Sequence, residues 1–118
     1  MWLLSGSNDS TVKLYDIRKL GDTDYSCELH TFEEEDNDIT ALEWHPVHED
    51  MFVSAGHNVT KPVSQDPNGK LIFWMAQGKM VQRINKAHRG QIWDLAWHNF
   101  DGHSLVSGGN DTYLTLWA

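Results

Sequence analysis

Short runs of hydrophobic residues, separated by polar turns, cover most of the chain, and none of them has a helical period. Three runs are rich in β-branched and aromatic residues and are bounded by Gly, Asn or Asp: VKLYD (12–16), KLIFW (70–74) and YLTLW (113–117). This pattern is typical of β-strands joined by tight turns. Two further runs, ITALEW (39–44) and IWDLAW (92–97), are almost continuously apolar, which predicts strands covered on both faces. We therefore expect an all-β protein.

Two other segments alternate polar and apolar residues, CELHTF (27–32) and KMVQRI (79–84), and predict outer strands with one solvated face. The chain thus repeats a cycle of inner strand, hairpin and outer strand. The cycle recurs after about 50 residues, or roughly 40 without an insertion at 57–67, and four-stranded propeller blades recur every ~40–45 residues. The period therefore predicts blades of a β-propeller.

A pattern of three residues recurs at both ends of the chain: a serine, an aspartate four positions later and an aromatic residue six positions after that. The first copy contains Ser5, Asp9 and Tyr15, and the last contains Ser107, Asp111 and Trp117. A middle copy keeps Ser54 and Trp74, has Asn68 in place of the aspartate, and is interrupted by the insertion.

The order of these phrases predicts three units. Residues 1–34 form a partial blade of strands b, c and d, residues 35–85 form a complete blade with the loop insertion 57–67, and residues 86–118 form a partial blade of strands a, b and c. The total is about two and a half blades with roughly ten antiparallel strands, short of the ~4–8 blades that close a propeller. We expect the chain to be part of a longer protein and to self-associate through open ends.

The spacing of the serine, aspartate and aromatic residue, with a histidine upstream, resembles the WD-repeat family. The resemblance implies a structural tetrad of hydrogen-bonded side chains in each complete blade, with the histidine in the loop before strand a. The last copy contains the full set: His88, Ser107, Asp111 and Trp117. Tyr15 replaces the tryptophan in the first copy, and Glu35 occupies the histidine position in the middle copy. A Ser–His–Asp set also occurs in hydrolases, but a buried serine has no substrate pocket, so we expect no catalytic residues.

Three segments narrow the resemblance: LEWHPVHEDMFVSAG (42–56), VKLYDIR (12–18) and GQIWDLAWH (90–98). They are similar to late repeats of the polyadenylation factor subunit 2 family, the WD-repeat subunit of the cleavage and polyadenylation factor. The resemblance implies a nuclear interaction scaffold in mRNA 3′-end processing, with protein subunits of that complex as partners. One alternative is a WD-repeat adaptor in an unrelated complex, such as a substrate receptor of a ubiquitin ligase. Another is a metal-dependent hydrolase.

Composition limits these functions. The net charge is −8, with nine Lys and Arg against seventeen Asp and Glu, so we expect contact with RNA only in the context of the full-length protein. The single cysteine, Cys27, excludes a disulfide framework and favours a reducing compartment. No signal peptide or long apolar run is present, so we expect a soluble intracellular protein without contact with a membrane.

Two candidate sites remain. HPVHE (45–49) places two histidines beside a glutamate, but a metal site needs further ligands, and Pro46 predicts a turn, so we expect no metal and no cofactor. A candidate interaction face combines an acidic stretch with Trp93, and the acidic stretch either is an ordinary solvated loop or attracts a basic partner. Trp93 is either an exposed contact residue or a packed one. The acidic residues are Glu33, Glu34, Glu35, Asp36 and Asp38.

Overall fold

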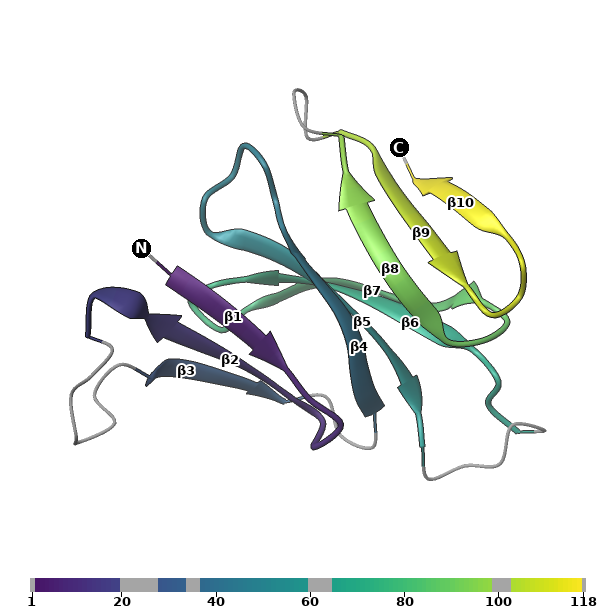
Figure 1. Ribbon diagram of the computed structural model, residues 1–118, viewed down its shortest axis with the longest axis horizontal. Coiled ribbons are helices and arrows are strands. Elements are labelled where there is room, and N and C mark those ends of the chain that lie inside the picture. Colours follow the sequence, from purple (N-terminus) through teal and green to yellow (C-terminus); the bar gives the residue numbers. More distant parts are fainter. Residues whose placement is uncertain (1, 20–27, 34–36, 60–64, 99–102, 118) are drawn as a thin grey trace.

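The structure, a computed structural model, describes residues 2–19, 28–33, 37–59, 65–98 and 103–117. In this part of the chain, ten β-strands form three antiparallel sheets (Figure 1). The first sheet contains β1 (Trp2–Gly6), β2 (Thr11–Asp16) and β3 (Glu28–Glu33); the middle sheet contains β4 (Asn37–Trp44), β5 (Met51–Asn58), β6 (Gly69–Met75) and β7 (Met80–His88); the third contains β8 (Ile92–Trp97), β9 (Leu105–Gly109) and β10 (Leu114–Trp117). The predicted all-β fold with ten antiparallel strands is confirmed.

Strands that follow one another in sequence are neighbours in each sheet, and the middle sheet lies between the other two (Figure 1). The first sheet has the order β1-β2-β3, the middle β4-β5-β6-β7 and the third β10-β9-β8. Such meanders, packed side by side, are the architecture of propeller blades. No helix in the described ranges is long and apolar enough to cross a bilayer.

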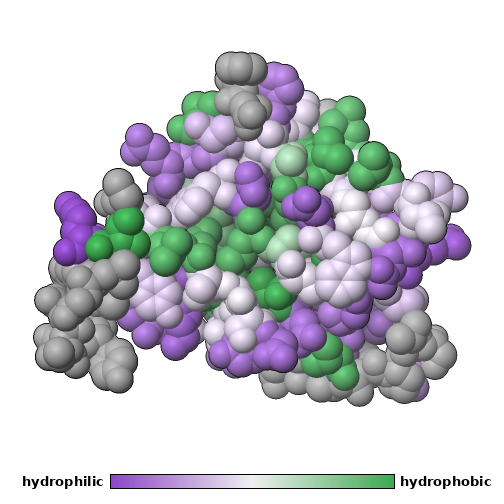
Figure 2. All heavy atoms as spheres, viewed as in Figure 1, coloured by the Kyte–Doolittle hydropathy of each residue, from purple (hydrophilic) through white to green (hydrophobic). Residues whose placement is uncertain are grey.

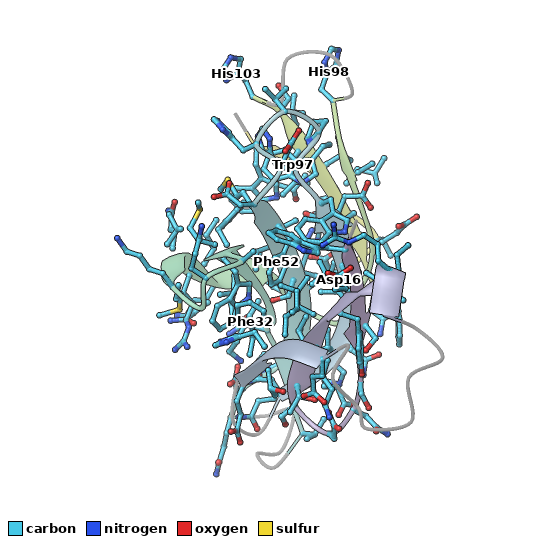
Figure 3. The ribbon with its side chains drawn as sticks, turned by 90° about the vertical axis from the view of Figure 1, so that its left-hand side faces the viewer. Asp16, Phe32, Phe52, Trp97, His98 and His103 are labelled. Carbon is cyan, nitrogen blue, oxygen red and sulfur yellow. The ribbon has the colours of Figure 1, made fainter. Side chains whose placement is uncertain are left out.

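Two hydrophobic clusters hold the three sheets together, and the middle sheet contributes to both. Side chains alternate across β5, so Phe52 enters one cluster while Val53 and Ala55 enter the other. Phe52 meets Phe32 of the first sheet edge to face, with ring centroids 5.0 Å apart (Figure 3). The first cluster comprises Val12, Leu14, Phe32, Phe52, Ile72, Trp74 and Ala76, and the second comprises Val53, Ala55, Leu71, Ile92, Leu95 and Leu105.

The repeated phrase forms the same turn in the first and third sheets. Asp9 accepts a hydrogen bond from the backbone N–H of Thr11 (2.9 Å), and Asp111 accepts one from that of Tyr113 (3.1 Å). The residue between the aspartate and the donor has a positive φ in both turns, 72° at Ser10 and 69° at Thr112. These side-chain bonds support a strained backbone conformation and explain why an aspartate recurs at this position.

Three strands differ from the expectations. β7 continues to His88, which pairs with Gly69, so this histidine ends a strand rather than lying in a loop. β5 continues to Asn58, so the insertion begins within a strand; residues 60–64 of it lie outside the described ranges. In both cases the backbone pairing extends past the apolar pattern. The prediction that both inner strands are covered on both faces is wrong for β8, because Trp93 is 55% exposed and no sheet among the described residues packs over it.

Hydrophobic side chains also lie exposed on the hairpin of the third sheet. Leu114 and Leu116 of β10 are 80% and 68% exposed. In Figure 2 hydrophobic residues gather on the side of the molecule where this hairpin lies. The side chains on this face of the edge strand β10 therefore have no cover from the described part of the chain.

Candidate functional site

The structure brings together the four predicted tetrad residues of the last copy. His88 at the end of β7 places Nε2 2.7 Å from the Oγ of Ser107 on β9. The indole N–H of Trp117, on β10, donates to the same Oγ at 2.9 Å. The other ring nitrogen of His88 lies 3.0 Å from both carboxylate oxygens of Asp111. A neutral His88 protonated on Nδ1 satisfies all these bonds, since it donates to Asp111 and accepts from Ser107.

Asp111 connects this set to the backbone. Besides His88 it accepts hydrogen bonds from the backbone N–H of Arg89 (3.0 Å) and of Tyr113 (3.1 Å). The hydrogen bond with His88, followed by these backbone bonds, outweighs desolvation and lowers the pKa of Asp111 below its ordinary value. Ser107 is fully buried, and its hydroxyl is bonded on both sides. The arrangement therefore joins β7, β9 and β10 through side-chain hydrogen bonds.

The middle copy keeps part of this arrangement. Trp74 donates its indole N–H to the buried Oγ of Ser54 at 2.9 Å. Asn68 is half-buried, and its backbone N–H donates to the Asp66 carboxylate at 3.4 Å. Glu35, expected at the histidine position, lies outside the described residues.

The first copy keeps fewer of the tetrad's hydrogen bonds than the middle copy. Ser5 is exposed, and no hydrogen bond within the described ranges joins it to Tyr15. In the described part of the chain, the Asp9 carboxylate accepts hydrogen bonds only from its own turn, from the backbone and the hydroxyl of Thr11. Counted among the described residues, the three equivalent serines form a graded series, with two side-chain partners at Ser107, one at Ser54 and none at Ser5.

The HPVHE segment forms a turn capped by its own histidine. His45 is buried, and its Nδ1 accepts hydrogen bonds from the backbone N–H of Val47 (3.1 Å) and of His48 (2.9 Å). Its ring packs edge to face on Trp97 of the third sheet, with centroids 4.5 Å apart. Across the described ranges, no three His, Cys, Asp or Glu side chains are placed to hold a metal ion. The segment therefore works as a turn between β4 and β5.

The predicted interaction face is only partly described. Glu33 ends β3 with an exposed side chain, and Asp38 on β4 lies 4.0 Å from the ring of His57. Glu34, Glu35 and Asp36 lie outside the described residues. Trp93 is more than half exposed and donates its indole N–H to the side chain of Asn110. Of its two interpretations, the exposed one fits the structure.

Sequence reasoning missed a basic groove that spans two adjoining pockets of about 430 and 410 Å³. Asn68 and Lys86 line both pockets, so the two adjoin at these residues. Lys70, Arg83 and Arg89 supply the other cationic side chains of the groove. A count of Lys and Arg along the chain gives no sign that four of them meet at one place.

Comparison with known proteins finds similarity to one family of repeats in two segments of the chain. The model of the family described as "WD domain, G-beta repeat" matches residues 1–16 and 78–118, which contain the first and last copies of the repeated phrase. The chain is 26% identical over 115 residues to the WD-40 repeat-containing protein MSI3 of Arabidopsis thaliana, covering 98% of this chain and 25% of that protein.

Two other relatives are named after two different complexes or processes. The chain is 29% identical over 118 residues to "Cell division cycle 20.5, cofactor of APC complex" of Arabidopsis thaliana, covering 98% of this chain and 24% of that protein. It is 24% identical over 132 residues to polyadenylation factor subunit 2 of Schizosaccharomyces pombe, covering 99% of this chain and 25% of that protein. The chain thus spans about a quarter of the length of these relatives. The chain is thus similar to WD40 repeat proteins in the two matched segments, and its three blade-like sheets and the hydrogen-bonded set around Ser107 agree with that similarity.

Proposed function

We propose that the chain is part of a nuclear WD-repeat interaction scaffold of the mRNA 3′-end cleavage and polyadenylation machinery. The observation that carries this proposal is the similarity along 99% of the chain to a polyadenylation factor subunit. It is supported by the segment around the His45-capped turn, which is the most distinctive part of the resemblance.

The geometry fits a scaffold because its polar side chains are used to hold the blades. The hydroxyls of Ser54 and Ser107 are consumed by structural hydrogen bonds, and His45 caps a turn. Rigid sheets of this kind present their connecting loops and exposed side chains to partner proteins. We propose protein subunits of the complex as direct partners, and contact with RNA only within the full-length protein, since acidic residues outnumber basic ones here.

Purification of the full-length protein, tagged at its own locus, tests this proposal. We expect subunits of the cleavage and polyadenylation complex to co-purify stoichiometrically, and depletion of the protein to produce transcripts that extend past their poly(A) sites. Stoichiometric recovery of a different complex, with unchanged transcript ends on depletion, would contradict the proposal.

A second candidate is a WD-repeat adaptor in an unrelated complex. The 29% identity to a relative named as a cofactor of the APC complex favours it. The same purification distinguishes the two, because the co-purifying subunits differ.

A further inference from the structure

The basic groove concentrates positive charge in an acidic protein. The chain has nine Lys and Arg and a net charge of −8, yet four of its cationic residues line these two adjoining pockets. They come from different elements: Lys70 from β6, Arg83 and Lys86 from β7, and Arg89 from the turn after it. The fold gathers these charges along the middle sheet and up to its boundary with the third sheet.

Two carboxylates also line the groove, and both are already engaged. Asp66 bonds to Lys70 at 2.8 Å, and Asp111 is held by His88. Lys86 and Arg89 are exposed, and neither side chain makes an ion pair with any of the described residues. The groove therefore carries positive charge that its own carboxylates do not neutralise.

The rest of the lining consists mainly of hydrogen-bond donors. Asn68 belongs to both pockets, and the first pocket has four further amide side chains: Asn37, Asn58, Gln65 and Asn85. Amide and cationic side chains together suit a ligand with several acceptor oxygens. Within the lining, Lys70 already donates a hydrogen bond to one carboxylate, that of Asp66 (2.8 Å).

We propose that the basic groove binds an acidic segment of a partner protein, an extended peptide rich in Asp and Glu. A short peptide interacts mainly with charges within ~8 Å, the Debye length at physiological salt. A nucleic acid carries its negative charge far beyond the groove, and the net charge of −8 of this chain disfavours its approach. Bases also need aromatic surfaces for stacking, and the groove offers one exposed ring, that of Tyr113. This inference rests on the proposed function in one respect: the ligand of the groove is taken to be a segment of a partner protein.

Fluorescence anisotropy with a labelled peptide of alternating Glu and Gly tests the proposal, and the Gln-for-Glu peptide is its neutral control. We expect binding of the Glu peptide that weakens from about 50 to about 300 mM salt, as screening requires, and no binding of the Gln peptide. The double variant Lys86→Glu and Arg89→Glu should weaken binding about tenfold or more, equivalent to ~1.4 kcal/mol. Replacement of Glu by phosphoserine in the peptide should preserve binding, because the same donors can donate hydrogen bonds to phosphate oxygens.

Lys79→Glu is the matched control, because Lys79 is exposed and precedes β7 at the end opposite to Lys86. It should change the affinity less than twofold, and the circular dichroism spectra of all variants should match that of the parent chain. Equal binding of the Glu and Gln peptides, an equal effect of Lys79→Glu, or tighter binding of an A-rich RNA would overturn the proposal. This test is independent of which complex co-purifies with the full-length protein, so the two proposals can fail separately.

Discussion

The three equivalent serines allow the structural role of the tetrad to be measured. Replacement of Ser107 by Ala removes one oxygen from the third sheet and leaves the backbone unchanged. Ser54→Ala and Ser5→Ala make the same chemical change at the same position of the other two sheets. Ser54 and Ser107 are both buried and differ in the number of side-chain partners, so each serves as a control for the other. Ser5 is exposed, so its variant is the control for the chemical change without burial or partners.

The magnitudes follow from the groups that lose a partner. At Ser107 both His88 Nε2 and the indole N–H of Trp117 lose their hydrogen-bond partner, and a buried polar group without a partner costs ~1–3 kcal/mol. We therefore expect Ser107→Ala to lower the free energy of unfolding by about 3 kcal/mol. At Ser54 only the indole N–H of Trp74 is affected, which gives about 1.5 kcal/mol.

Ser5 is exposed and has no such partner, so Ser5→Ala should change stability by less than ~0.5 kcal/mol. The entropy of unfolding of a chain of this length is about 0.25 kcal/mol/K, so each kcal/mol lowers the melting temperature by about 4 °C. Thermal unfolding followed by circular dichroism should therefore rank the variants Ser107, Ser54, Ser5, with a drop of about 12 °C for the first. Equal drops for Ser107→Ala and Ser5→Ala would refute the assignment of the tetrad.

Further predictions concern packing, pH and association. Gly69→Ala should destabilise the protein strongly, because its Cβ would press on the Gly90 carbonyl oxygen, whereas Gly108→Ala meets only a leucine methyl group at 3.2 Å and should melt near the parent temperature. The lowered pKa of Asp111 means that its carboxylate stabilises the fold above pH 3.8 and loses this effect as the pH falls through the folded-state pKa. Asp111→Asn should therefore flatten the dependence of the urea midpoint on pH between about 2 and 5, and an unchanged slope would contradict this. Exposed leucines on β10 should cause concentration-dependent self-association in sedimentation experiments, and Leu116→Lys should reduce it; a monomer at all concentrations would contradict this.

The strands could be predicted because each carries its own local signals. Asp9 and Asp111 mark the turns of two hairpins, and alternating residues mark the outer strands. Strand ends were less predictable, because backbone pairing continues where the apolar pattern stops. His88 belongs to β7 because it pairs with Gly69. The sequence around these two residues does not predict that pairing.

A candidate site could be predicted from the sequence only where its residues belong to one copy of the repeated pattern. The tetrad is what the family resemblance of the phrase around Ser107 implies, and the structure brings its four residues together. The basic groove depends on which strands become neighbours, since its cations are spread from Lys70 to Arg89 and the net charge of −8 favours the opposite expectation. The loss of partners at Ser5 also follows from its exposure, which the repeated pattern does not reveal.

The membership of β5 in both hydrophobic clusters has a consequence for how mutations combine. Phe32 and Leu105 belong to different clusters, so the free-energy costs of truncating them should add in a double-mutant cycle. Truncation of Phe52 should couple to truncation of Phe32, which lies in the same cluster. Truncation of Val53 should couple to truncation of Leu105 for the same reason. The two outer sheets can therefore accumulate substitutions independently during evolution, whereas β5 evolves under the constraints of both at once.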